Sequence, residues 1–206
     1  VLGGLGFPVV FELRRLWRSP SDWSLHTKVT LSVSASLLAA GSVMIGLVEW
    51  NNANTLGELP RDERVLASIF QSATARTAGF DTVPIGSLRP ASLMVLILLM
   101  VVGAGSASTG GGIKVTSFAV VVKATMAELR GDDTTTLFDR GISQKLRAQA
   151  LSLVVAALGT IGTATFLLLA IDPDMRLADV LFESASAFGT VGISTAPTSI
   201  SCIALF

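Results

Sequence analysis

Two short segments of the sequence carry the pattern Thr-x-Gly, which suits the binding of a dehydrated cation by backbone oxygens. They are Thr77-Ala78-Gly79 and Thr190-Val191-Gly192. Successive carbonyl groups turned toward one axis can replace the water shell of an ion. Glycine is needed where the backbone adopts a positive φ or approaches the ion closely. One such segment is a weak signal, but two within a repeated unit are a strong one.

Each Thr-x-Gly segment lies at the end of one copy of an internal repeat. Residues 70–82 align with residues 182–195 once a single gap is placed at Gly189, and the identical positions are Phe, Ser, Ala, Ala, Thr, Gly and Thr. Each copy follows a long apolar stretch and a polar segment. A repeated unit suggests that one kind of site is assembled from several copies around an axis.

A third segment, residues 103–114, is rich in glycine and interrupts an apolar run. Five of the ten residues from 103 to 112 are glycine, and each interior glycine costs a helix about 1 kcal/mol relative to alanine. We therefore expect the helix to break here, at membrane depth. Irregular backbone in a bilayer is tolerated only against protein or a wet cavity. We therefore predict that residues 103–114 form a gate or an ion-facing element. The alternative is that they form a glycine-rich face for helix packing.

The composition excludes several other classes of protein. Of the 206 residues 50% are hydrophobic and 15% charged, and the mean hydropathy is +0.66; soluble domains are about 25% charged. The balance of 15 basic against 15 acidic residues gives no sign of nucleic-acid binding. A single cysteine, Cys202, and a single histidine, His26, exclude an intrachain disulfide framework and Cys- or His-rich metal centres.

No enzymatic motif is present, so we expect a protein that is not an enzyme. The glycine-rich segment superficially resembles a phosphate-binding loop. That motif requires a glycine directly before its lysine, whereas here Ile113 separates Gly112 from Lys114. Gly103-Ala104-Gly105 lacks the third glycine of the dinucleotide fingerprint. We expect no cofactor in this chain.

Long uncharged stretches predict membrane spans. Residues 29–48, 90–113 and 148–171 carry no charge, and each reaches the approximately 20 residues that a spanning helix needs. We expect spans over about 28–50, from about Ala91 onward, and over about 148–171. Because the chain begins and ends within apolar runs, we expect it to be part of a longer membrane protein.

Two shorter pieces, residues 64–75 and 177–187, precede the Thr-x-Gly segments and are too short to cross a membrane. Residues 1–28 and 114–147 hold ten Lys or Arg, against five in 49–90 and 172–183. The positive-inside rule places the more basic segments in the cytoplasm. Both short pieces then enter from outside as re-entrant half-helices, and their negative carbonyl ends point toward the membrane centre.

Three motifs occur in the same order as in a known family. They are Ala75-Arg76-Thr77-Ala78-Gly79-Phe80-Asp81-Thr82, Ser108-Thr109-Gly110-Gly111-Gly112-Ile113-Lys114 and Phe188-Gly189-Thr190-Val191-Gly192-Ile193-Ser194. With these motifs the chain resembles the Trk/Ktr/HKT potassium transporters, and among them the bacterial KtrB and TrkH membrane subunits, along nearly its whole length. Its glycine-rich segment differs from the common family pattern in lacking a proline.

This resemblance implies the fold class: an all-α integral membrane protein with repeated span–pore-helix–span units of a potassium-channel-like pore, re-entrant half-helices and a broken inner helix. Residues 1–18 would end the second repeat. Residues 19–130 would form the third, with a gating loop at 103–114, and residues 131–206 the fourth, without its last span.

The resemblance also assigns the site residues. The ion-binding filter residues would bind K⁺ through their backbone carbonyls, and they are Thr77, Ala78, Gly79, Phe80, Thr190, Val191, Gly192 and Ile193. The gating loop would use Gly103, Gly105, Ser108, Thr109, Gly110, Gly111, Gly112 and Lys114.

The function implied is K⁺ uptake by passive permeation in the bacterial plasma membrane, with Na⁺ as a possible second ion. The implied partners are the lipid bilayer, a second copy in a homodimer and a cytoplasmic nucleotide-binding ring subunit of KtrA or TrkA type, but no nucleic acid. The alternative is a secondary transporter whose discontinuous helices surround a midplane substrate site.

Three charged residues near these motifs have expected roles. We expect Arg76 to pair with a nearby carboxylate such as Asp81, with contact to the ion as the alternative. We expect Glu183 to anchor its half-helix through a hydrogen bond, with attraction of cations as the alternative. For Lys114 the alternatives are bracing of the gating loop, repulsion of cations, or an ordinary charge facing the cytoplasmic vestibule.

Overall fold

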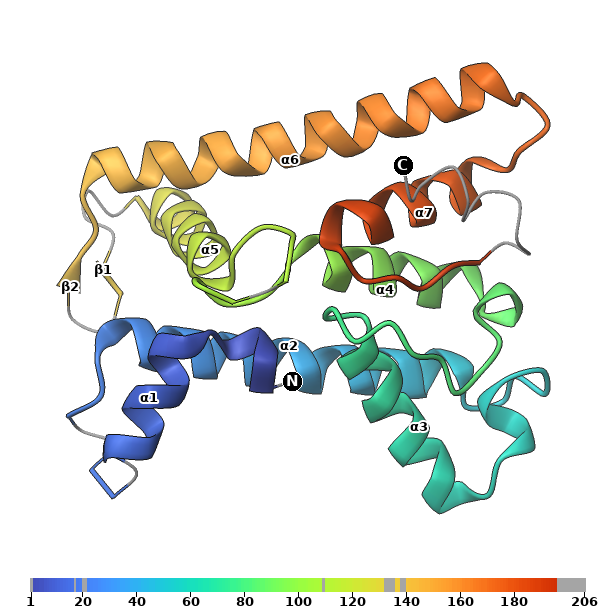
Figure 1. Cartoon of the computed structure of the whole chain (residues 1–206), viewed down its shortest axis with the longest axis horizontal. Helices are drawn as coiled ribbons and strands as arrows, with labels where there is room; N and C mark the ends of the chain where they lie inside the picture. The colour runs from blue at the N-terminus through green and yellow to red at the C-terminus, as the bar shows by residue number, and fades with distance from the viewer. Residues whose placement is uncertain are drawn as a thin grey trace.

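Two long helices frame the molecule, and the broken inner helix and the half-helices lie between them. The computed structural model describes residues 2–16, 18–19, 22–108, 110–131, 136–137 and 140–195. Helices α2 (Leu25–Glu49) and α6 (Gln144–Ile171) run in the same direction on opposite sides of the molecule (Figure 1). Their most apolar stretches have mean hydropathies of 2.0 and 2.2, and only 17% of each stretch is buried inside the protein. Such long, apolar and outward-facing helices suit a lipid environment.

Both long helices begin at a serine cap. The Ser24 hydroxyl accepts a hydrogen bond from Thr27 N, and the Ser143 hydroxyl accepts one from Leu146 N. A serine at this position satisfies one of the free amides in the first turn. The helices therefore start about three to four residues before the uncharged stretches that predicted them, because the charged first turn is also helical.

The second expected span is a broken helix. Helix α4 (Pro90–Val101) ends, and α5 (Val115–Arg130) begins only after the glycine-rich segment. The two ends of this segment are held together, since Gly103 N donates to Ile113 O at 3.0 Å and Ile113 N donates to Val101 O at 2.9 Å. The break predicted from the glycine content is thus observed, and α2 and α6 are the uninterrupted helices of membrane length in the described part of the chain.

Two half-helices enter from one end of the molecule and stop near its middle (Figure 1). They are α3 (Arg61–Thr74) and α7 (Leu177–Gly189), with 14 and 13 residues. At 1.5 Å per residue each is about 20 Å long, which is shorter than the membrane core. The fold class is therefore as predicted from the sequence, with half-helices that do not span.

The remaining elements are short. A 3₁₀ turn (Leu2–Leu5) and α1 (Phe7–Leu16) precede α2, and further 3₁₀ turns occupy Leu56–Glu58 and Ile85–Ser87. Strands β1 (Thr136–Leu137) and β2 (Arg140–Gly141) pair antiparallel, with Thr136 opposite Gly141. Apart from these two-residue strands, the regular secondary structure of the described residues is helical.

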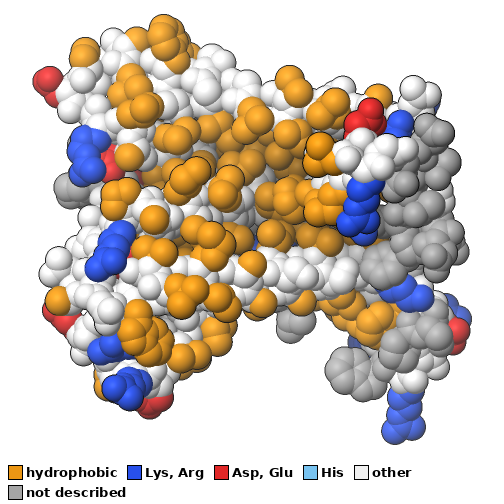
Figure 2. Space-filling view, turned by 180° about the vertical axis from the view of Figure 1, so that it is seen from behind, with side chains coloured by type: hydrophobic (Ala, Val, Ile, Leu, Met, Phe, Trp, Pro, Cys, Tyr) orange, Lys and Arg blue, Asp and Glu red, His pale blue; other side chains and the backbone are white. Residues whose placement is uncertain are grey.

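The core lies where the half-helices meet α4. Phe182, Leu96 and Met100 are completely buried there, and Val191 and Ile193 of the second Thr-x-Gly segment belong to the same cluster. On the outside, hydrophobic side chains spread over the middle of the face in Figure 2, while charged side chains gather toward its two margins. This distribution is the one expected of an apolar belt between two aqueous surfaces.

The carboxylate of Glu49, at the end of α2, organises the loops that follow. It is fully buried and accepts hydrogen bonds from Arg89 N at 2.9 Å and from the Ser92 hydroxyl at 2.5 Å through one oxygen. The other oxygen accepts from Asn52 Nδ2 at 2.6 Å and from the Thr55 hydroxyl at 2.8 Å. One side chain therefore ties the end of α2 to the start of α4.

We expect Glu49→Gln to lower the melting temperature of the protein by several degrees. The glutamine amide would face Arg89 N or Asn52 Nδ2, so that two donors oppose each other, which costs about 2 kcal/mol. The measurement is thermal unfolding in detergent by fluorescence-detected size exclusion. The matched control, Glu63→Gln on the exposed face of α3, should leave the melting temperature unchanged. Equal effects of the two variants would contradict this role.

Candidate functional site

Each Thr-x-Gly segment follows the end of a half-helix and has two left-handed residues. In the first, φ is 67° at Thr77 and 74° at Gly79; in the second, φ is 52° at Thr190 and 85° at Gly192. A β-branched residue at positive φ is a rare and strained conformation. That both threonines adopt it indicates the same imposed backbone path in both repeats.

A hydroxyl group in each half-helix holds the Thr-x-Gly segment that follows it. The Thr74 hydroxyl accepts from Phe80 N at 2.9 Å and donates to Phe80 O. The Ser186 hydroxyl donates to Ile193 O at 2.7 Å. Thr74 and Ser186 occupy equivalent positions of the repeat. Sequence reasoning assigned them no role, although two hydroxyl residues at one repeat position were a signal that could have identified them.

The two segments lie side by side. A Cβ atom added at Gly79 would lie only 2.7 Å from Val191 O and 3.9 Å from the Cα of Gly192. The structure thus brings together the residues predicted to form the filter, 77–80 and 190–193. It buries Ile193, whereas Phe80 is 71% exposed. Ion binding by these residues remains a prediction.

The glycine-rich segment packs against the threonines of both repeats. Gly111 N donates to the Thr190 hydroxyl at 2.8 Å. A Cβ atom added at Gly110 would lie 2.9 Å from Thr77 Cγ2, and one at Gly111 would lie 2.9 Å from Phe188 O. Only glycine allows this close approach. The predicted gating loop therefore touches the helix-facing end of both Thr-x-Gly segments.

Internal hydrogen bonds hold the loop in shape. The Ser108 hydroxyl donates to Gly105 O at 2.7 Å, and Lys114 Nζ donates to Gly110 O at 2.6 Å. The latter contact supports the bracing interpretation of Lys114. Thr109, also predicted as a loop residue, lies outside the described residues.

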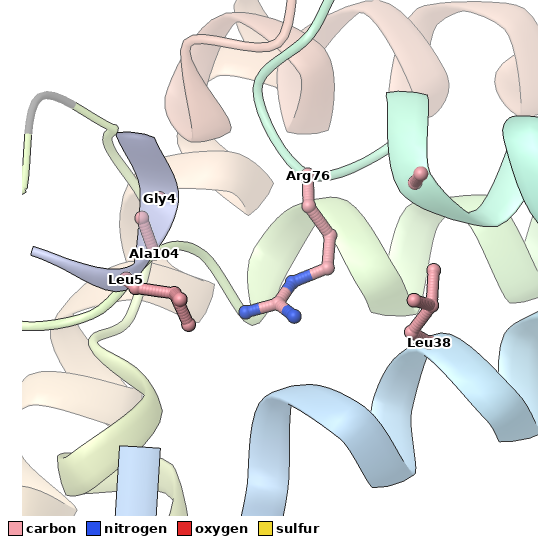
Figure 3. A pocket seen from close by; sticks show the side chains of 6 residues that line it. Gly4, Leu5, Leu38, Arg76 and Ala104 are labelled. Atoms are coloured by element: carbon pink, nitrogen blue, oxygen red, sulfur yellow. The ribbon is translucent and has the colours of Figure 1, made fainter. Parts of the chain in front are cut away.

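Arg76 does not pair with Asp81, so that prediction is wrong. Its guanidinium donates to Ser34 O at 3.2 Å, to the Ser34 hydroxyl at 3.1 Å and to Gly103 O at 3.4 Å, while the Asp81 side chain is exposed. The side chain reaches from the first Thr-x-Gly segment toward Ala104 (Figure 3). It lines a cavity of about 10 Å³, the size of one water molecule. Arg76 thereby links this segment to α2 and to the base of the gating loop.

Glu183 anchors α7 as predicted. Its carboxylate accepts hydrogen bonds from Thr195 N at 2.9 Å and from the Ser194 hydroxyl at 2.5 Å. Since these partners follow Ile193, the bonds fix the chain leaving the second Thr-x-Gly segment. A cluster of three or more His, Cys, Asp or Glu side chains that could hold a metal ion does not occur among the described residues.

Comparison with known proteins identifies the family. The family model described as TrkH, cation transport protein, matches residues 1–205. The chain belongs to this family. It is 40% identical over 200 residues to Ktr system potassium uptake protein B of Vibrio alginolyticus, a match that covers 97% of this chain and 44% of that protein. It is 38% identical over 194 residues to Ktr system potassium uptake protein B of Bacillus subtilis (strain 168), covering 94% and 43%.

A solved structure shows the same fold for this member of the TrkH family. The crystal structure of the potassium transporter TrkH from Vibrio parahaemolyticus matches with a TM-score of 0.73 at 14% identity. The match covers 99% of this chain and 46% of that one. The chain therefore spans less than half the length of the relatives that it matches.

If the Thr-x-Gly segments select K⁺ over Na⁺, we expect Thr74→Val to weaken that discrimination severalfold in the full-length protein. The isosteric valine would leave Phe80 N and Phe80 O without a partner, and the first Thr-x-Gly segment would lose its fixed position. The measurement is the ratio of Rb⁺ to Na⁺ flux into proteoliposomes. Thr74→Ser, which keeps the hydroxyl, should retain the wild-type ratio. Identical behaviour of the two variants would exclude this role for the hydroxyl.

Proposed function

We propose that this chain forms part of a K⁺-uptake pore, in which K⁺ permeates passively along the two Thr-x-Gly segments; Na⁺ is a possible second permeant ion. Both relatives described above are named potassium uptake proteins. Because the chain covers only part of their length, the activity of the whole protein is inferred from this part.

One observation supports the proposal most strongly: the carboxyl ends of both half-helices meet at the paired Thr-x-Gly segments. A helix carries negative partial charge at its carboxyl end, so α3 and α7 together favour a cation where they converge. A secondary transporter that holds an anionic substrate would present amino ends instead. The polarity of the half-helices therefore favours a cation path over that alternative.

The glycine-rich loop is proposed to close this path. It lies against the threonines of both repeats and is held at its first end, through Gly103 O, by Arg76 and near its second end, through Gly111 N, by Thr190. Further hydrogen bonds join it to the N-terminal segment, from Gly105 N to Gly4 O and from Phe7 N to Ala107 O. A segment held by individual hydrogen bonds can open without unfolding the helices that carry it.

The cytoplasmic end of the protein is proposed to receive a regulatory partner. Helix α5 exposes Met126 and Leu129 there, with Lys123 and Arg130 nearby, and Leu146 at the start of α6 is also exposed. Apolar side chains among basic ones suit a protein surface. We propose a nucleotide-binding ring subunit of KtrA or TrkA type at this end, a homodimer of the full-length protein, and the bacterial plasma membrane as its location.

We expect Gly79→Ser to weaken K⁺ selectivity at least tenfold. The serine would have to adopt φ near 74° and place its Cβ 2.7 Å from Val191 O, so the filter must shift. The measurement is Rb⁺ and Na⁺ flux in a strain that is deficient in K⁺ uptake and expresses the full-length gene. Gly131→Ser is a matched control, because Gly131 has φ 73° but no atom within 4 Å of an added Cβ. Unchanged selectivity in Gly79→Ser would count against the filter.

Deletion of residues 104–111 should raise Rb⁺ flux several-fold. Gly103 and Gly112 can be joined directly, since a Cβ atom added at either residue would lie 2.9 Å from the Cα atom of the other. If the loop is the gate, its removal opens the path while both Thr-x-Gly segments stay in place. Flux is measured with and without the regulatory subunit, and the variant should no longer need it. Unaltered flux would rule out a gating role.

A further inference from the structure

The hydroxyl of Thr190 is the point at which the gating loop meets the proposed filter. It accepts a hydrogen bond from Gly111 N at 2.8 Å, which joins residues 79 positions apart in the chain. Thr77 occupies the same position in the other repeat and is also covered by the loop, because a Cβ atom added at Gly110 would lie 3.2 Å from its hydroxyl oxygen. Thr77 forms no hydrogen bond to the described part of the loop. The two repeats therefore differ in their contact with the loop.

A hydroxyl oxygen bound to an amide is poorly suited to bind a cation on the same side. The N–H group of Gly111 carries positive partial charge and occupies the space in front of the Thr190 oxygen. A cation at the inner end of the Thr-x-Gly segments would need that oxygen, or at least the space now filled by the loop backbone. The amide and the cation thus compete for one position.

We propose that the Thr190 hydroxyl is a ligand exchanged between the gating loop and a permeant cation at the inner end of the filter. Occupancy by K⁺ and closure of the loop then exclude each other. Because binding free energies are linked reciprocally, K⁺ at this position favours the open loop, and the closed loop lowers the affinity for K⁺. This inference rests on the proposed function and adds to it a control of the gate by the transported ion.

The loop amide itself provides the test. Hydrogen–deuterium exchange of the peptide spanning residues 103–114 is measured on the full-length transporter in lipid nanodiscs, in KCl and in choline chloride of equal ionic strength. Exchange should be about fivefold faster in KCl, since loss of one hydrogen bond of ordinary strength has an effect of this size. Equal exchange in the two salts would overturn the proposal.

Variants of the two threonines separate the exchanged ligand from a general effect on the filter. Thr190→Val should give fast exchange in both salts, and Thr190→Ser should keep the wild-type response. Thr77→Val removes a hydroxyl from the same region but no hydrogen bond to the described part of the loop, so its loop should stay protected in choline chloride. If the loop in Thr190→Val is protected from exchange in choline chloride as well as the loop in Thr77→Val, the proposal is overturned.

A variant of the loop removes the contact without altering the threonine. In Gly111→Ala the new Cβ would lie 2.9 Å from Phe188 O and from Thr190 Cγ2, so the loop cannot seat. Exchange should be fast in both salts and unstimulated Rb⁺ flux should rise several-fold. If wild-type protein carries Rb⁺ but Gly111→Ala and Thr190→Val leave exchange and flux unchanged, this inference fails and the pore remains. If wild-type protein carries no Rb⁺, the proposed function fails, whatever the exchange shows.

Discussion

The structure depends on the two helix ends that stop inside the protein. The last carbonyl groups of a helix have no partner within it, and α3 and α7 end near the middle of the molecule, where the apolar core surrounds them. A buried unpaired carbonyl is costly, so something polar must meet these ends. The chain meets part of this need itself, since Val191 N bonds back to Ser186 O and Ala78 N to Thr74 O. The oxygens that remain are those that a cation could use.

The same constraint explains why the Thr-x-Gly segments are strained and yet fixed. Two threonines at positive φ each raise the free energy of the folded state by about 1–3 kcal/mol. The hydroxyls of Thr74 and Ser186 offset this cost, because they form hydrogen bonds with the backbone of the residue that follows each glycine. Glu183 adds a further hydrogen bond, from Thr195 N, just after the second segment. Strain at the site is thus maintained by hydrogen bonds from the half-helix that immediately precedes it.

Local pattern predicted most of the fold, and contacts between distant residues account for what it did not predict. Glycine content located the broken helix, and the repeat located both half-helices and both Thr-x-Gly segments. Helix ends differed by a few residues because charged first turns are helical. The partner of Arg76 was mistaken, since proximity in sequence favoured Asp81, whereas packing brings Ser34, 42 positions away, to the guanidinium. The bond between Gly111 and Thr190 has no signature in either segment alone.

The differences between the two repeats are as informative as their likeness. The first copy has Arg76 directly before its Thr-x-Gly segment and holds the base of the loop through Gly103 O. The second copy has one additional residue, at the gap placed at Gly189, and holds the loop near its second end, through the bond from Gly111 N to the Thr190 hydroxyl. Because each repeat secures a different part of the loop, a displacement of either half-helix alters the support of the whole. The middle of the loop is bonded to the N-terminal segment instead, from Gly105 N to Gly4 O and from Phe7 N to Ala107 O. Because its two ends are bonded to different repeats, the loop is sensitive to their relative position. The difference in sequence at Arg76 supplies the bond to Gly103 O, whereas the bond to Thr190 arises from position alone, because Thr77 is the same residue type and forms no such bond to the described part of the loop.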